Sequence, residues 1–239
     1  MIEPATLSTT KITRPIRDRF RIRFAKFDLL RWIGHHDLQR LWERMLRRNQ
    51  LQLLISDGFH PRPRISFPSA LALGVEGLDE VVEIELAQTI TAEELRLLLV
   101  RDGQPGLTIG EVTLMATKGG NGDGTGISPG LNKAKHHSSD YEIEIPDGYD
   151  LTRVDRAIEI NQTLEVITVQ RKEKTICVWA NKVFPVVTRR DRFICVTQIE
   201  IDGPSVRITD LLDTIQLTDL LPLGGIIRRT QLYLTDQLT

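Results

Sequence analysis

The sequence predicts an α+β protein built from two ferredoxin-like halves, each a βαββαβ unit with an antiparallel sheet and its helices on one face. Three observations lead to this prediction. Strand-like and helix-like apolar periods follow one another as βαββαβ in the first half, the second half repeats the order less regularly, and a glycine-rich segment separates the halves. Two right-handed βαβ crossovers of this kind form a split sandwich.

The first half begins with a strand and an amphipathic helix. Phe20, Ile22 and Phe24 alternate with arginines, which is the period of a strand with one buried face. From His36 to Gln50 the apolar side chains recur at helical spacing, namely Leu38, Leu41, Trp42 and Met45. A turn rich in glycine and proline follows, and it leads into a short extended segment, ISF.

The rest of the first half repeats a strand, a helix and a strand. Val81–Leu86 alternates apolar and acidic residues, as a strand does. Thr91 is followed three residues later by Glu94, which is the spacing of a capping box at the start of a helix. Leu107–Met115 then predicts the closing strand.

A segment with six glycines, 116–139, predicts a linker. We therefore expect a flexible N-terminal segment (1–18), a first domain (19–115), this linker (116–139) and a second domain (140–239). In the second domain the predicted elements are a strand at Tyr141–Ile145, a helix at Leu151–Ile160, an inserted hairpin of Glu165–Arg171 and Thr175–Ala180, a strand at Phe193–Ile201, a helix capped by Thr209, and a strand at Ile226–Leu234.

The net charge of −1 conceals a strong asymmetry along the chain. The block from Arg14 to Arg64 holds 13 basic and 5 acidic residues, a net charge of +8, whereas Ile65–Met115 holds 2 basic and 9 acidic residues, a net charge of −7. A basic block followed by an acidic block indicates a polyanionic partner, an internal charge match, or both.

The arginines fall into two sets. Those of the first strand (Arg17, Arg19, Arg21 and Arg23) point to the sheet face without helices, which ferredoxin-like RNA-binding proteins use for RNA. The alternative is that Arg21 and Arg23 pair with Glu83 and Glu85 of the strand beside them. The set on the first helix has only Glu43 nearby in sequence, which predicts either an unpaired basic stripe or a solvated face; its members are Arg40, Arg44, Arg47 and Arg48.

The motif SDGFHPRPRISF predicts a stiff loop, because Pro61 and Pro63 restrict the backbone and donate no N–H. Such a loop suits a nucleotide clamp in which a base stacks on an aromatic ring and arginines hold phosphate; the candidates are Phe59, His60, Arg62 and Arg64. The alternative is a connector whose Phe59 fills the core. His36 is a candidate helix cap, and it becomes a candidate catalytic residue with His60 if the two rings converge.

Other functional signals are absent from the sequence. No phosphate loop, dinucleotide-binding or hydrolase motif occurs. The two cysteines, Cys177 and Cys195, lie far apart, so we expect no metal site, iron–sulfur cluster or other cofactor held by this chain alone. No signal peptide and no membrane span is recognisable, so we expect a cytoplasmic protein.

Several motifs between Arg21 and Leu86 carry a family resemblance: Lys26, HHDL, RMLRR, GFHPRPRISF and LALGVEG, with a weaker echo in IIRRTQL near the C-terminus. In this order they resemble the bacterial radical SAM-linked, or radical SAM-associated, proteins with a DUF2344 domain. Such domains are often fused to cobalamin-binding radical SAM proteins or encoded beside them. The resemblance implies an accessory role, with S-adenosylmethionine and an iron–sulfur cluster held only by a separate radical SAM partner.

Three functions fit these observations. The first is an RNA-binding module that presents its substrate to the radical SAM partner, with Arg40, Arg44, Arg47, Arg48 and the loop as the contact surface. The second is an enzyme that acts on RNA phosphate through His36 and His60, as RNA-processing proteins of the RAMP type do in a similar fold. The third is a docking scaffold whose basic helix binds an acidic protein surface. We favour the noncatalytic RNA-binding module.

Overall fold

The computed structural model describes residues 17–56, 59–118, 134–171, 173–183, 185–199 and 206–237, and every structural statement below concerns these ranges. Within them the chain is an α+β protein with four α-helices, one large sheet that is mostly antiparallel, and a small two-stranded sheet. The predicted α+β class is therefore confirmed. Residues 1–16, most of the predicted N-terminal segment, lie outside the described ranges.

The first half has the predicted order of elements. They are β1 (Arg17–Lys26), the 3-10 helix η1 (Asp28–Trp32), α1 (His35–Arg48), β2 (Ile65–Ser66), β3 (Glu76–Leu86), α2 (Ala92–Asp102) and β4 (Leu107–Lys118). The capping box is present at α2: the Glu94 N–H donates to the Thr91 hydroxyl, and the Glu94 carboxylate accepts from the Thr91 N–H. The helix α1 begins one residue earlier and ends two residues earlier than predicted.

The second half contains every predicted element, including the inserted hairpin, and one further strand, Val186–Arg190, that the sequence analysis did not predict. Its elements are β5 (His136–Glu144), α3 (Leu151–Gln162), β6 (Val166–Arg171), β7 (Lys174–Trp179), β8 (Val186–Arg190), β9 (Phe193–Ile199), α4 (Ile208–Thr214) and β10 (Ile227–Leu234), with short 3-10 helices between some of them. The cap of α4 is Arg207 and not Thr209, because the Asp210 carboxylate accepts from the Arg207 N–H.

The predicted linker, 116–139, is too wide at both ends. The strand β4 continues to Lys118 and β5 begins at His136, so regular structure reaches into the linker from both sides. Residues 119–133 lie outside the described ranges. Glycine content predicted the centre of this segment but not its ends. At the C-terminal end the polar residues of HHSS belong to β5 and pair with β9 and β10.

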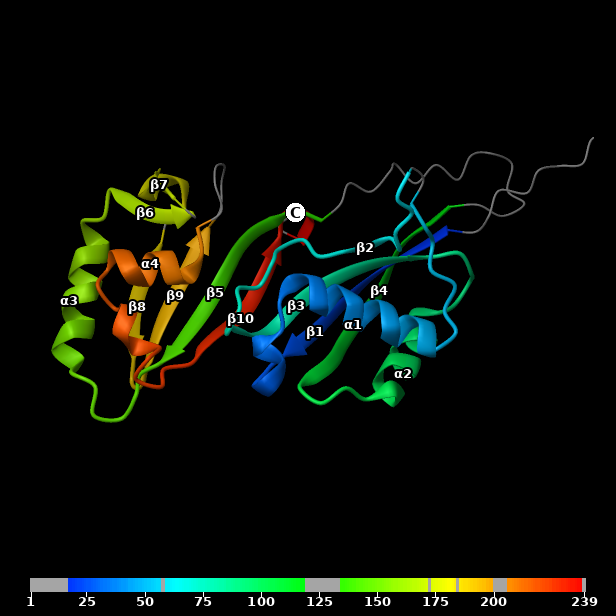
Figure 1. Ribbon diagram of the computed structural model, residues 1–239, viewed down its shortest axis with the longest axis horizontal. Coiled ribbons are helices and arrows are strands. Elements are labelled where there is room, and N and C mark those ends of the chain that lie inside the picture. The colour runs from blue at the N-terminus through cyan, green and yellow to red at the C-terminus, as the bar shows by residue number, and fades with distance from the viewer. Residues whose placement is uncertain are drawn as a thin grey trace, which may run out of the picture.

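One sheet runs through both halves, whereas the sequence predicted a sheet for each. The strand order is β4-β1-β3-β10-β5-β9-β8, with β2 beside β3. The last strand, β10, lies parallel to β3 and antiparallel to β5, and so it joins the two halves edge to edge. Figure 1 shows β10 between them, with α1 and α2 over one end of the sheet and α3 and α4 over the other.

Each half has its own apolar core between sheet and helices. In the first half Trp42 is completely buried and meets the ring of Phe24 edge to face at 5.1 Å. The predicted helical stripe is buried at Leu38, Trp42 and Met45, while Leu46 takes the inward place expected of Leu41. The second core is larger and is built from β5, β8, β9, the hairpin and the helices α3 and α4.

Candidate nucleic-acid interface

The arginines of β1 are paired with acidic side chains across the sheet. Arg17 pairs with Glu85, Arg19 with Glu83, Arg23 with Asp79, and Arg21 lies between Glu83 and Asp236. Burial lowers the pKa of Arg21, but the hydrogen bonds to Asp236 and Glu83 outweigh it and raise the pKa overall. The predicted pairing is therefore confirmed for Arg21 with Glu83, whereas Arg23 pairs with Asp79 in place of the expected glutamates. Arg21 is only 6% exposed and is not available to RNA.

The arginines of α1 are exposed, and three of the four have acidic partners. The Nη atoms of Arg40, Arg47 and Arg48 lie 3.4, 2.8 and 3.0 Å from carboxylate oxygens of Asp37, Glu43 and Asp102. Arg44 has no ion pair or hydrogen bond within the described chain. The expected unpaired stripe is thus wrong for three members. Exposed pairs such as Arg40–Asp37 and Arg47–Glu43 contribute only about 0.2–1 kcal/mol.

The loop after α1 is a narrow hairpin. Ser56 N–H donates to the Arg62 carbonyl and Arg64 N–H donates to the Leu54 carbonyl, both at 2.8 Å. The side chains of Phe59, His60 and Arg62 are exposed at its outer end, with Phe59 fully exposed. Phe59 therefore does not fill the core, which excludes the connector interpretation for this ring. Residues 57 and 58 lie outside the described ranges.

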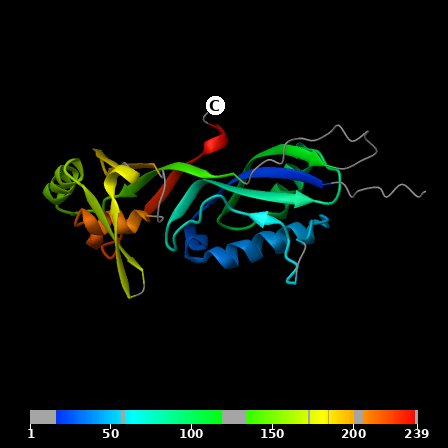
Figure 2. The same ribbon diagram turned by 90° about the horizontal axis from the view of Figure 1, so that it is seen from above.

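The loop and α1 lie on the same side of the sheet. Figure 2 shows the loop, drawn in cyan, projecting past α1 and further from the sheet than the helix. Arg64 differs from the other loop residues, because its side chain turns back to the sheet, where its Nε lies 3.8 Å from Glu85. Of the residues predicted for the contact surface, the exposed ones are therefore the arginines of α1 with Phe59, His60 and Arg62.

The two histidine candidates are not brought together. The ring centroids of His36 and His35 lie 5.8 Å apart, and those of His35 and Phe67 lie 5.3 Å apart. Partial burial, His36 and Lys26 lower the pKa of His35. His36 lies in the first turn of α1, whereas His60 lies in the loop that follows the last turn (Figure 1). In the described chain no three His, Cys, Asp or Glu side chains cluster as metal ligands.

A buried charged cluster lies where the two halves meet, and sequence reasoning missed it. The guanidinium of Arg229 on β10 donates two hydrogen bonds to the Glu80 carboxylate on β3 and one, at 2.9 Å, to the Ser69 hydroxyl. Lys26 is also buried, and its ammonium donates to the Ile33 carbonyl at 3.1 Å. Burial lowers the pKa of Lys26, while the charge of Glu80 acts in the opposite direction.

One sequence signal could have found this cluster. Lys26 and Glu80 stand at even-numbered positions, in phase with Phe20–Phe24 and Val82–Leu86, whose side chains face the core. A charged residue at an inward position of a strand requires a buried partner. The sequence did not supply that partner, because Arg229 follows Glu80 by 149 residues.

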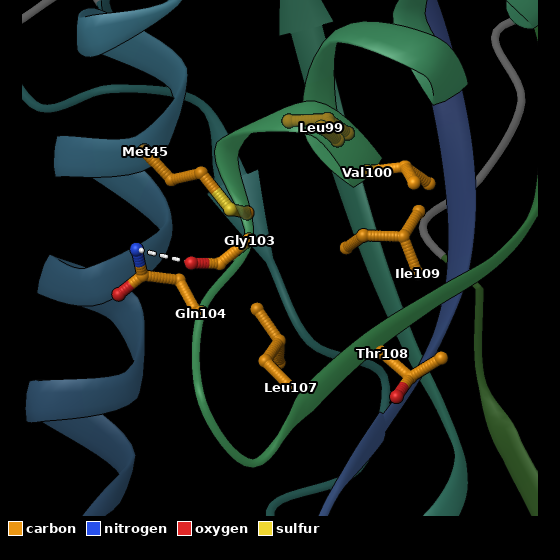
Figure 3. A pocket seen from close by; sticks show the side chains of 8 residues that line it. All are labelled: Met45, Leu99, Val100, Gly103, Gln104, Leu107, Thr108 and Ile109. Atoms are coloured by element: carbon orange, nitrogen blue, oxygen red, sulfur yellow. Dashed lines mark hydrogen bonds between the residues drawn. The ribbon is translucent and has the colours of Figure 1, made fainter.

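A small pocket of about 150 Å³ lies between α1, α2 and β4 (Figure 3). Its walls are mostly apolar, with Met45, Leu99 and Ile109 among them, and its only side-chain amide, Gln104, donates to the Gly103 carbonyl at 3.4 Å. No charged side chain lines it. The pocket therefore suits a small apolar group and not a phosphate or a metal ion.

Comparisons with known proteins identify the family but not the activity. No curated protein matches the chain. A crystal structure of an unknown protein from Galdieria sulphuraria matches with 9% identity and a TM-score of 0.28, over 92% of this chain and 99% of that one. A putative glycine cleavage system transcriptional repressor matches with 9% identity and a TM-score of 0.27, over 91% of this chain and 97% of that one. Neither similarity is close enough to carry an argument.

None of the helices in the described ranges has the length and apolar character of a membrane span. Residues 19–181 match the family described as uncharacterised proteins conserved in bacteria, DUF2344, and this match covers the first half and the second half up to the end of the inserted hairpin. The chain therefore belongs to the DUF2344 family.

Proposed function

We propose that this protein is a noncatalytic accessory protein that binds RNA on the surface formed by α1 and the 55–63 loop, and presents it to a separate radical SAM partner. The observation that carries the proposal is the ring of Phe59, which is fully exposed on a loop stiffened by Pro61 and Pro63. An exposed phenyl ring gains nothing for folding, whereas stacking a base on such a ring contributes about 1–3 kcal/mol.

The charges around the loop support the same proposal. Arg62 lies three residues from Phe59, and both are exposed. Arg44, Arg47 and Arg48 are exposed on the last turns of α1, just before the chain enters the loop. In this proposal a base stacks on Phe59, a neighbouring phosphate binds Arg62, and phosphates further along the strand bind the arginines of α1. Guanidinium groups bind phosphate in a bidentate manner.

The proposed radical SAM partner rests on the family resemblance and on one exposed patch. Leu29 and Trp32 are both exposed and stand three residues apart in the 3-10 helix η1, a spacing that places them on one face. The Trp32 ring packs against Gly74, and the residue before this glycine, Leu73, is also exposed. Contiguous apolar surface of this kind marks protein-docking sites. S-adenosylmethionine and the iron–sulfur cluster belong to the partner in this proposal.

We also propose that each half is a ferredoxin-like unit. The order β4-β1-β3-β2 in the first half and the order β10-β5-β9-β8 in the second support it, because both place the fourth strand beside the first and the second beside the third. In both halves this arrangement leaves one sheet face for helices. The hairpin β6-β7 is then an insertion between the first helix and the second strand of the second unit.

Salt-dependent RNA binding tests the proposal. Replacing Arg44, Arg48 and Arg62 with Gln, together with Phe59→Ala, is expected to weaken binding of a single-stranded oligonucleotide and of tRNA. The three lost phosphate contacts should flatten the slope of log K against log salt by about 2, at about 0.7 per contact. The matched control replaces three exposed arginines of the second half, Arg189, Arg190 and Arg192, with Gln, and it should leave the slope unchanged.

The two alternatives predict other results in the same experiment. If both variants bind RNA like the wild type, the RNA-binding surface is not the one proposed. If the wild type cleaves the RNA, and His36→Ala or His60→Ala stops the cleavage, the protein is an enzyme. If no RNA binds, and the arginine variant instead loses an acidic protein partner, the protein is a docking scaffold.

The docking patch has a separate test. We expect Trp32→Asp with Leu73→Asp to abolish co-purification with a radical SAM protein of the cobalamin-binding type while RNA affinity stays unchanged. Leu151→Asp with Val186→Asp, two exposed apolar residues of the second half, is the control with the same added charge. Retention of the radical SAM protein by the patch variant would contradict docking through Trp32 and Leu73.

A further inference from the structure

Lys26 is a buried amine at the junction of the two halves. It is the last residue of β1 and is only 1% exposed. In the described part of the chain its Nζ donates one hydrogen bond, to the Ile33 carbonyl at 3.1 Å, and has no carboxylate within ion-pair distance. Burying an ammonium group without such a partner costs stability, so the contribution of Lys26 to folding does not explain its position.

The acid whose charge acts on Lys26 is bound to another cation. The Glu80 carboxylate accepts two hydrogen bonds from the Arg229 guanidinium. Gly77 pairs with Lys26 on one side and with Arg229 on the other, and a Cβ at Gly77 would overlap the Glu80 side chain. Glu80 therefore occupies the space over Gly77, between the two basic residues. One buried carboxylate thus serves two buried cations, and the cluster has an excess positive charge while Lys26 is protonated.

This excess charge favours the neutral amine of Lys26. Burial lowers the pKa of Lys26; the charge of Glu80 opposes this decrease, and that of Arg229 adds to it. A lysine that is removed from water beside another cation is a typical nucleophilic amine, because its nitrogen keeps a free lone pair at a lower pH than that of an exposed lysine. The arrangement of Gly77, Glu80 and Arg229 therefore suits Lys26 to react with an electrophile.

The nitrogen of Lys26 lies near the surface, at the start of α1. Its acceptor Ile33 and the N-cap residue Gly34 are partly exposed, and His35 is exposed. Figure 1 shows that β1 ends and α1 begins on the side of the first half that faces β10. A small molecule therefore has to pass only this short stretch of chain to reach the amine.

The same end of α1 favours a ligand with a negative charge. Gly34 offers no side chain to cap the helix, so the N–H groups of the first turn have no capping side chain as acceptor. The carboxylate of that turn, Asp37, lies 3.4 Å from the Nη1 of Arg40. Free N–H groups at a helix N-terminus bind carboxylates and other anions. Together with the amine of Lys26, they match a carbonyl compound that also carries a carboxylate, which is a 2-oxo acid.

We propose that Lys26 is a nucleophilic amine that binds a small 2-oxo acid reversibly as an imine. The lone pair of Nζ attacks the carbonyl carbon and forms the C–N bond. The carbonyl oxygen then leaves as water with the two amine protons, and the C=N double bond remains; addition of water reverses the reaction. The carboxylate of the ligand binds the N–H groups at the start of α1. The proposal is independent of RNA binding and of the radical SAM partner.

Reductive trapping of the full chain tests the proposal. Incubation with glyoxylate, the smallest 2-oxo acid, and cyanoborohydride at neutral pH should convert Lys26 to carboxymethyl-lysine, which peptide mass spectrometry locates. We expect Lys26 to be labelled several-fold faster than Lys182, which is exposed. Acetaldehyde lacks the carboxylate and should label Lys26 with a smaller preference over Lys182. An excess of pyruvate should slow the labelling of Lys26 by glyoxylate.

Thermal unfolding of Lys26→Met distinguishes a reactive lysine from a structural one. Methionine is neutral and of similar length, so the variant should lose the trapping at position 26 and unfold at a higher temperature than the wild type, because it no longer buries an amine. Lys182→Met is the matched control and should change neither property. Labelling of Lys26 no faster than that of Lys182, or a lower unfolding temperature for Lys26→Met, would overturn the proposal. A wild type that inorganic phosphate stabilises but glyoxylate does not label would overturn it as well, in favour of a simple anion site.

Discussion

The guanidinium of Arg229 and the carboxylate of Glu80 form a buried bidentate ion pair that connects β10 to β3 across the boundary between the two halves. The Nε of Arg229 lies 2.7 Å from Oε1 of Glu80, and the two residues are 2% and 3% exposed. Next to the pair, β10 shares only two register positions with β3, at Arg228 and Arg229. The ion pair therefore reinforces the short ladder that makes the two halves one sheet.

Removing one member of this pair should destabilise the protein strongly. We expect Arg229→Met to lower the free energy of unfolding by about 3–5 kcal/mol, because the Glu80 carboxylate is left buried without its partner. The double variant Arg229→Met with Glu80→Met should recover most of that loss. Urea denaturation of the wild type and of the two variants measures both effects. A single variant as stable as the wild type would show that the pair does not hold the halves together.

The core of the first half depends on Trp42. We expect Trp42→Ala to cost about 3–5 kcal/mol of stability, since the ring is fully buried against Phe24. Trp179→Ala is the matched control, because Trp179 is exposed on the hairpin strand β7 and should change stability far less. Thermal and chemical unfolding measure the two values. An unchanged midpoint for Trp42→Ala would contradict the assignment of this ring to the core.

The arginines of β1 should contribute to stability and not to RNA binding. We expect Arg21→Gln to lower stability by about 1.5–3 kcal/mol, because the buried Glu83 loses its charged hydrogen bonds to Arg21 and keeps only its pair with Arg19. The salt slope of RNA binding should not change. Arg40→Gln on the exposed face of α1 should change stability by less than about 0.5 kcal/mol. Reduced RNA affinity of a folded Arg21→Gln protein would return the sheet face to consideration.

Tyr149 should ionise at an unusually high pH. Burial and the hydrogen bond from its hydroxyl to Asp219, at 2.9 Å, raise the pKa of Tyr149 from 10.0 to about 12. The native state therefore favours the neutral phenol. The stability that the Tyr149 hydroxyl contributes is complete below pH 10 and is lost as the pH rises through about 12. The tyrosinate absorbance of the wild type minus that of Tyr149→Phe should have its midpoint near pH 12. A midpoint near pH 10 would show that Tyr149 is not held by Asp219.

Local patterns were sufficient for most elements. The alternation of Phe20, Ile22 and Phe24, the helical stripe around Trp42 and the capping box at Thr91 each depend on residues within a few positions of one another. Such patterns express the geometry of a single strand or helix, and they predicted the order of elements in the first half and all of the second half except β8. They did not predict the single sheet, because β3 and β10 are more than a hundred residues apart in sequence.

The candidate surface was predicted only in part, again because sequence patterns record local spacing and not long-range contacts. The sequence predicted a stiff loop at SDGFHPRPRISF and a basic face on α1, since both predictions follow from residue types at short spacing. Only the tertiary structure decided which charges are free and which are paired. The partners of Arg21, Arg48 and Arg229 come from other elements and follow or precede them by 54 to 215 residues. Pairing at such distances depends on how strands and helices are placed together, and no local period of the sequence records it.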